Sequence, residues 1–118
     1  MLFQHLIVNA IKFRQQHLHP IIRISAKEKS GFWQLSVKDN GIGIKKEYSI
    51  KIFNIFQRLH ARGKYEGYGI GLSHCKKIVH LHGGTIWVES VPNHGSTFYF
   101  TIPRKFILKS SGKIKGYL

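Results

Sequence analysis

The chain has 118 residues, enough for one domain, and its 42% of apolar residues favours a packed core over intrinsic disorder. Nineteen lysines and arginines against five acidic residues give a formal net charge of +14. These cations are spread along the whole chain without a zinc-finger, ribonucleoprotein or helix-turn-helix motif, so we expect a generally basic surface and do not expect nucleic acid as the partner. No apolar run reaches the roughly 20 residues that cross a bilayer, and we expect no membrane contact.

A helix is predicted over residues 1–17, before Pro20. Its apolar residues recur at helical spacing and form one broad face, made by Leu2, Phe3, Leu6, Ile7, Ala10 and Phe13. Beside that face runs a polar row of His5, Asn9, Lys12 and Gln16. Asn9 is either a solvated helix residue or an oxygen ligand for Mg²⁺, and Lys12, one turn later, could reach a phosphate.

A β-hairpin follows, because apolar residues alternate on both sides of a turn at residues 29–31. The alternating residues are Ile22, Ile24 and Ala26 before the turn, and Trp33, Leu35 and Val37 after it. The second strand leads into Asp39-Asn40-Gly41-Ile42-Gly43. Asp39 is either a turn residue or a buried carboxylate that accepts a hydrogen bond from a ligand, which Gly41 and Gly43 would admit.

Residues 47–57 suit a short helix, and residues 58–71 suit a mobile, glycine-rich loop. A helix over residues 72–82 comes next and ends at Gly83-Gly84. Two strands, TIWVES and STFYFTI, close the chain around a turn at residues 93–95. This order of elements predicts an α/β two-layer sandwich, with helices on one face of a mixed, mostly antiparallel sheet.

The stretch GYGIGL (Gly67–Leu72) places three glycines at alternate positions where that helix begins. Its spacing differs from the G-x-G-x-x-G of dinucleotide-binding folds, and no G-K-[ST] of a P-loop occurs in the chain. It is either a plain loop or a helix entrance that offers unpaired N–H groups to an anion.

The single cysteine, Cys75, is expected in the core, because no base is positioned to activate it. One cysteine forms no disulfide within the chain, which fits a cytoplasmic protein. The histidine pairs His17/His19 and His80/His82 lack the spacing of a structural zinc site, so we do not expect metal binding by His or Cys.

Five segments, in this order, resemble the boxes of the ATP-binding catalytic domain of sensor histidine kinases. They are LIVNAIKF (N box), DNGIGI (G1), KIFNIFQRL (F), GYGIGLSHCKKIVHLHGGTIWVES (G2 with its helix and strand) and GSTFYFTIP (G3). The resemblance covers residues 2–103 and implies the Bergerat fold, which gyrase-type topoisomerases and ninety-kilodalton heat-shock chaperones share (the GHKL superfamily). The residues of the F and G2 boxes are most similar to those of kinases with phytochrome-like or PAS-type sensors.

The resemblance implies an ATP·Mg²⁺ site. Asn9 would hold Mg²⁺ and Lys12 a phosphate, with His5 and Phe13 beside them on the helix. Asp39 would accept the adenine amino group, with Gly41, Gly43 and Ile44 around the base, and Thr97 would back up Asp39 near the adenine. Phe56 and residues 58–65, including Arg58 and Lys64, would form a lid. The backbone N–H groups of Gly67, Gly69 and Gly71 would hold phosphates, with Tyr68, Ile70 and Leu72 among them.

The chain departs from the family pattern in three ways. His5 stands where histidine kinases usually carry asparagine and ATP-hydrolysing relatives a glutamate base, which argues against an ATPase of the gyrase or chaperone kind. Tyr68 replaces a usual small residue. None of the eight histidines is followed by an acidic residue, so the phosphoacceptor is missing, and the strand that precedes the N box is absent, which implies an N-terminally truncated sheet.

The expected function follows from this resemblance. Residues 1–103 would be a cytoplasmic domain that positions the γ-phosphate of ATP for transfer to a histidine on the dimerisation domain of the same kinase. A response regulator receiver domain would then be the partner of that kinase. Residues 104–118 would be a basic tail. The chain alone would bind ATP without autophosphorylation. Two alternatives are a degenerate binding module, which docks to a helical dimer or a polyanion, and a serine kinase of the anti-sigma type.

Overall fold

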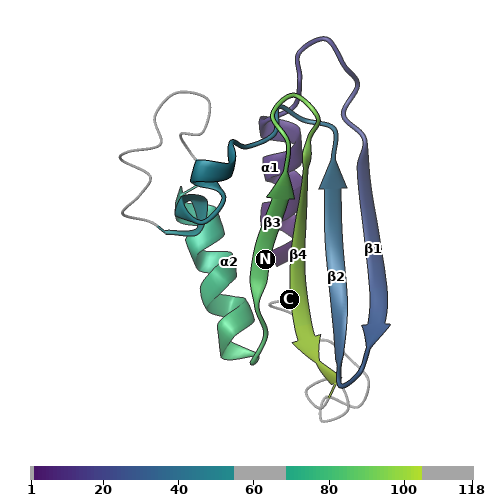
Figure 1. Ribbon diagram of the computed structural model, residues 1–118, viewed down its shortest axis with the longest axis vertical. Helices are drawn as coiled ribbons and strands as arrows, with labels where there is room; N and C mark the ends of the chain where they lie inside the picture. Colours follow the sequence, from purple (N-terminus) through teal and green to yellow (C-terminus); the bar gives the residue numbers. More distant parts are fainter. Residues whose placement is uncertain (1, 55–68, 105–118) are drawn as a thin grey trace.

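The computed structural model describes residues 2–54 and 69–104, and every structural statement below concerns this part of the chain. The elements are α1 (Leu2–Lys12), β1 (Ile22–Lys29), β2 (Phe32–Asp39), the 3-10 turns η1 (Lys46–Tyr48) and η2 (Lys51–Phe53), α2 (Gly69–Leu81), β3 (Ile86–Ser90) and β4 (Ser96–Pro103). Both predicted hairpins are present (Figure 1). None of the described helices is long and apolar enough to cross a membrane.

The four strands form one sheet in the order β1-β2-β4-β3 (Figure 1). The two hairpins join through β2 and β4, which pair antiparallel with Leu35 opposite Phe100. Every strand pairing among the described residues is therefore antiparallel. We expected a mixed, mostly antiparallel sheet, and no parallel pairing occurs among the described strands.

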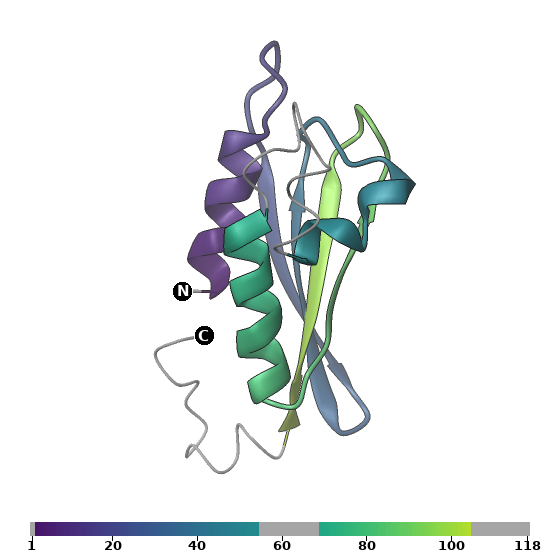
Figure 2. The same ribbon diagram turned by 90° about the vertical axis from the view of Figure 1, so that its left-hand side faces the viewer.

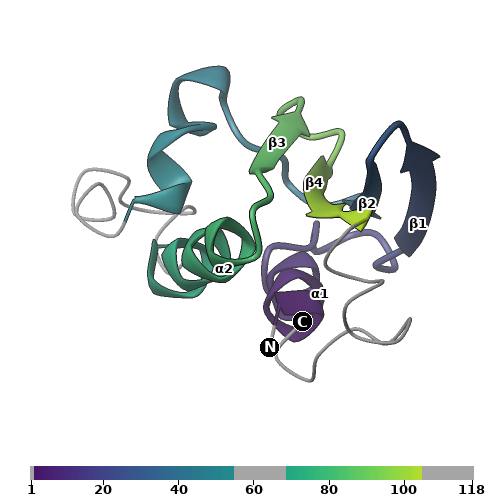
Figure 3. The same ribbon diagram turned by 90° about the horizontal axis from the view of Figure 1, so that it is seen from below.

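Both helices cover the same face of the sheet, as Figures 2 and 3 show. Strand alternation turns Leu35 and Val37 of β2 toward the helices, together with Phe98 and Phe100 of β4, and all four are buried there. Cys75 of α2 is fully buried in the same core, as predicted. Its burial raises the thiol pKa to about 12, which keeps the sulfur protonated and unreactive. The predicted two-layer arrangement is confirmed.

The predicted helix ends differ from the observed ones. Helix α1 ends at Lys12, not residue 17, and the carbonyl of Phe13 just beyond it accepts the N–H of Ile42 instead of continuing the helix. The Asn40 side chain accepts a hydrogen bond from the Ile21 N–H and donates one to the carbonyl of His19, both at 2.9 Å. Helix α2 begins at Gly69, three residues before the predicted start and inside GYGIGL. The short helix predicted for residues 47–57 is two 3-10 turns as far as residue 54.

Candidate functional site

The first turn of α2 lies against the polar row of α1. The Nδ1 atom of His5 would be only 3.3 Å from a Cβ atom placed on Gly71, so glycine leaves the imidazole its room. The His5 ring also meets the His74 ring edge-on, with 5.8 Å between centroids. Burial lowers the pKa of His5, and the N-terminal amine and His74 lower it further. The predicted polar row of α1 and the predicted glycine stretch are thus neighbours in space.

Asn9 lies one turn after His5 and is 8% exposed. Its Nδ2 atom has no hydrogen-bond partner among the described residues. A buried polar group left in this state costs about 1–3 kcal/mol, so it marks a position where a ligand can supply the missing partner. Because a half-turn of the amide exchanges nitrogen for oxygen, the same position can present an oxygen to a cation. Among the donors of this chain, a buried amide oxygen suits Mg²⁺.

Asp39 ends β2 as a half-buried carboxylate. Its Oδ1 atom accepts hydrogen bonds from the N–H groups of Gly41 (2.9 Å) and Ser96 (3.2 Å). Among the described residues no donor reaches Oδ2, which remains able to accept a hydrogen bond from a ligand. Burial raises the pKa of Asp39, and the two backbone hydrogen bonds offset part of that rise. Asp39 is therefore both a turn residue and a half-buried carboxylate. Its Oδ1 atom accepts the hydrogen bonds that hold the turn, and its Oδ2 atom remains for a ligand.

Gly41 and Gly43 are explained by the packing of the protein's own backbone. A Cβ atom on Gly41 would lie 2.6 Å from the carbonyl oxygen of Phe13, and the Phe13 oxygen also accepts the N–H of Ile42 at 2.9 Å. A Cβ atom on Gly43 would lie 2.2 Å from the carbonyl oxygen of Val91. The close approach of the protein's own backbone therefore explains both glycines, whereas we had interpreted them as the entrance for a ligand.

The first turn of α2 presents backbone N–H groups that have no partner within the helix. Because α2 begins at Gly69, the groups of this kind among the described residues belong to Gly69, Ile70 and Gly71. They carry the positive end of the helix dipole, as the anion-site interpretation of GYGIGL requires. Gly67, Tyr68, Phe56, Arg58 and Lys64 lie outside the described residues.

The other predicted residues have definite places. Lys12 is exposed at the end of α1, with its Nζ atom 5.6 Å from the centre of the Phe13 ring. Phe13, Ile44 and Leu72 belong to the hydrophobic core. The N–H of Ile44 donates to the Ser90 hydroxyl at 2.7 Å, which ties the end of the G1 segment to β3.

The expected position of Thr97 as a support for Asp39 is wrong. Thr97 pairs with Lys38, so strand alternation turns it to the face opposite that of Val37 and Asp39. Its neighbour Ser96 is buried and donates its N–H to Asp39. Ser96, and not Thr97, therefore lies beside Asp39.

The sequence analysis missed Gln15, which connects three segments around the site. Its Nε2 atom donates to the carbonyl oxygens of Asn40 (3.1 Å), Gly41 (3.1 Å) and Asn93 (3.0 Å). The loop after α1, the turn after β2 and the turn before β4 thus share one donor. No local pattern in the sequence signals this role, because all three acceptors are backbone groups distant in the chain.

Replacing Gln15 with alanine is expected to lower the free energy of unfolding by roughly 1–3 kcal/mol, since three carbonyl oxygens, two of them in part-buried hydrogen bonds, lose their donor. The matched control is Gln16→Ala, an exposed neighbour whose removal should change that free energy by no more than about 0.5 kcal/mol. Urea denaturation of both variants measures the difference, and equal values would contradict the role of Gln15.

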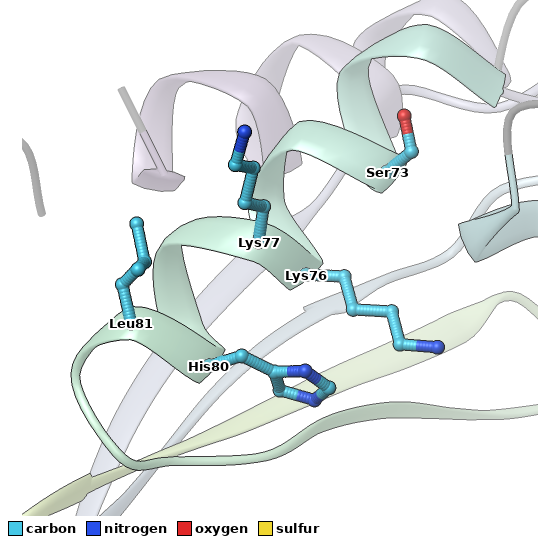
Figure 4. Close-up of a pocket in the computed structure, with 5 residues that line it drawn as sticks. All are labelled: Ser73, Lys76, Lys77, His80 and Leu81. Carbon is cyan, nitrogen blue, oxygen red and sulfur yellow. The ribbon is translucent and has the colours of Figure 1, made fainter.

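Two hollows on the surface lie apart from Asn9. One, of about 390 Å³, is lined by Ser73, Lys76, Lys77, His80 and Leu81, which all belong to α2 (Figure 4). In Figure 4, Lys76 and His80 extend to one side of the helix, and Ser73 and Lys77 to the other. The second hollow, of about 250 Å³, is lined by Ile21, Arg23, Lys38, Asp39 and Asn40. The volumes of these hollows do not identify the candidate site, which is identified by the polar groups described above.

Comparison with known proteins decides the family. The model of the family described as histidine kinase-, DNA gyrase B-, and HSP90-like ATPase matches residues 1–105. The chain belongs to this family. Among its relatives, cyanobacterial phytochrome A of Nostoc sp. is 57% identical over 102 residues, which are 86% of this chain and 13% of the relative.

Other relatives agree with this assignment. The adaptive-response sensory kinase SasA of Prochlorococcus marinus is 44% identical over 101 residues, 84% of this chain and 26% of the kinase. The nucleotide-free catalytic domain of histidine kinase ThkA matches in structure with a TM-score of 0.70 and 34% identity, over 87% of this chain and 64% of that domain. The chain thus spans about an eighth to a quarter of the length of these two sequence relatives.

Proposed function

We propose that this domain binds ATP with Mg²⁺ and holds the γ-phosphate for transfer to a histidine on a separate dimerisation domain, from which a receiver domain takes it. The observation that carries the proposal is Asp39, whose Oδ1 is held by two backbone N–H groups while Oδ2 faces no protein donor among the described residues. The amino group of adenine is a donor that such a carboxylate accepts. We further propose that the domain, residues 1–103, works in the cytoplasm.

The remaining groups divide the phosphates and the metal among them. The unpaired N–H groups at the start of α2 hold phosphate oxygens, and Lys12, exposed one turn after Asn9, reaches the same charge. The side-chain oxygen of Asn9 would hold Mg²⁺, which would neutralise phosphate charge when it is bound. Phosphoryl transfer depends on position and charge, so these residues act by orienting ATP.

Titration with a fluorescent ATP analogue tests the site. We expect saturable binding in Mg²⁺ that weakens about tenfold or more in EDTA, and Asn9→Ala should remove most of this difference. Because the unpaired Nδ2 atom of Asn9 costs stability in the absence of a ligand, Asn9→Ala should not lower the free energy of unfolding. The matched control, Gln16→Ala, removes an exposed amide and should bind like the parent.

The phosphoacceptor is tested separately with radiolabelled ATP. We expect the chain alone to remain unlabelled and a histidine-bearing dimerisation domain added in trans to become labelled on histidine. A folded chain that binds no nucleotide, with or without Mg²⁺, would contradict the proposed function.

A further inference from the structure

The face of the sheet opposite the helices carries a concentration of positive charge that the sequence does not show. Strand alternation and register place the side chains of Arg23, Lys27 and Lys29 of β1 on this face, with Lys38 of β2 beside them. Glu89 of β3 is the one acid among the described strand residues on this side. We call this side the open face, because α1 and α2 both lie on the other side (Figure 3).

Aromatic rings lie on the same open face. Trp87 of β3 and Tyr99 of β4 are cross-strand neighbours whose rings stack at 5.2 Å with 15° between their planes. Both side chains are half-exposed, so part of their ring surface remains open to solvent. Burial raises the pKa of Tyr99, and its hydrogen bond to Glu89 raises it further, so the hydroxyl stays neutral and the ring keeps its orientation. A partly exposed stacked pair of this kind offers a base a surface on which to stack.

The register brings the rings and the cations together. Ser25, Ser36, Tyr99 and Trp87 form one row across the four strands. Arg23 and Lys38 begin the adjacent row on one side, and Lys27 begins the adjacent row on the other. The three strand spacings from Trp87 to β1 amount to about 14 Å, so a chain that crosses the sheet passes from the rings to the cations within a few nucleotides. Arg23 and Lys38 also line the 250 Å³ hollow at the end of this face, together with Ile21, Asp39 and Asn40.

We propose that the open face binds single-stranded nucleic acid, whose bases stack on Trp87 and Tyr99 and whose phosphates meet Arg23, Lys27 and Lys38. An exposed four-stranded antiparallel sheet with aromatic rings and cations is a known platform for single strands. A duplex hides its base faces, and an acidic protein or a lipid surface has no bases to stack on the rings. The proposal revises our expectation about nucleic acid, because the fold gathers cations that the sequence leaves dispersed, and it stands independently of ATP binding.

Trp87 itself reports the contact. In a Trp33→Phe background Trp87 is the only tryptophan of the chain, and Trp33 lies on the helix side of the sheet. We expect oligomers of 15 deoxythymidines or 15 uridines to quench its emission by about half or more on saturation, and the tighter of the two identifies the preferred sugar. Duplex DNA and heparin should leave that emission nearly unchanged. Binding of the oligomers without quenching, or equal quenching by duplex DNA, would overturn the proposal.

Two double variants that lose the same charge distinguish the effect of the open-face lysines on binding from the effect of net charge. Lys27→Gln/Lys38→Gln should weaken oligomer binding about tenfold or more and reduce the slope of log K against log salt by about 1.4, or 0.7 for each phosphate that no longer meets a lysine. Lys76→Gln/Lys77→Gln removes the same charge from α2 and should change the affinity less than about twofold. Thermal midpoints within a few degrees of the parent show that both variants are folded. Equal weakening by the two pairs would overturn the proposal.

Discussion

Replacing Asp39 with asparagine is expected to weaken ATP binding roughly 100-fold while the protein remains folded. The asparagine Oδ1 can still accept the N–H groups of Gly41 and Ser96, which preserves the turn. The Nδ2 group that replaces the second carboxylate oxygen is a donor, and it would face the amino group of adenine, which is also a donor. The matched control is Glu47→Gln, which removes an exposed acid from η1 with the same change of net charge.

The same carboxylate should select adenine over guanine. Guanine carries an oxygen acceptor where adenine carries its amino group, so the Asp39 carboxylate repels it. We expect GTP to compete poorly with ATP for the parent chain. In Asp39→Asn the difference between the ATP and GTP affinities should be smaller. Competition titrations with the fluorescent analogue measure both effects. Equal ATP affinity in the Asp39 and Glu47 variants would show that the adenine does not bind at Asp39.

The raised pKa of Asp39 fixes the sign of its effect on stability. Burial disfavours the charged form in the folded state, so the free energy of unfolding is higher when the carboxyl is protonated and falls as pH rises through the folded-state pKa. Asparagine carries no such charge, so Asp39→Asn should be the more stable protein without nucleotide at pH 7, and the difference should disappear in acid. Denaturation at pH 7 and below that pKa checks this, and a variant less stable at pH 7 would contradict it. The expected outcome would make Asp39 a residue retained for binding at a cost in stability.

The two hairpins could be predicted from the sequence because strands have a period of two. Ile22, Ile24 and Ala26 alternate with Arg23, Ser25 and Lys27, and this alternation predicts that β1 pairs with β2. The same alternation places Arg23 and Lys27 on the open face. That face becomes visible only when β1 is placed beside β2, since Lys38 is distant in the chain. The error at Thr97 has the same origin, because alternation with Phe98 and Phe100 puts Ser96 on the helix side.

The ends of the helices could not be predicted, because tertiary hydrogen bonds decide them. The polar row of α1 continues in the sequence to Gln16, but the helix ends at Lys12, where Gln15 and Asn40 hold the following loop against two turns. The site residues were found through motifs, and their contacts came from the structure. His5 against Gly71 is such a contact, since helical spacing places each residue on a face without giving its neighbour on the other helix.

Replacing Gly43 with alanine is expected to destabilise the fold by roughly 3–5 kcal/mol, the upper range for single substitutions. Two effects combine at this position. Its φ of 74° is a left-handed conformation that costs an alanine about 1–2 kcal/mol, and the new Cβ atom would lie 2.2 Å from the carbonyl oxygen of Val91. The adjacent Pro92 backbone is also too close, with its Cα atom at 2.9 Å from that position. Neither neighbour is a flexible side chain, so the turn itself has to move.

Gly31 offers the matched control, because its φ of 82° is similar and a Cβ atom there meets nothing within 4 Å. Gly31→Ala should therefore show the conformational cost alone, about 1–2 kcal/mol, by urea denaturation. The difference between the two variants isolates the contact between the G1 turn and the segment that leads into β4. Because that contact positions Asp39 beside Ser96, Gly43→Ala should also weaken ATP binding in whatever fraction remains folded. Equal destabilisation at the two glycines would contradict the close contact between Gly43 and the Val91 backbone.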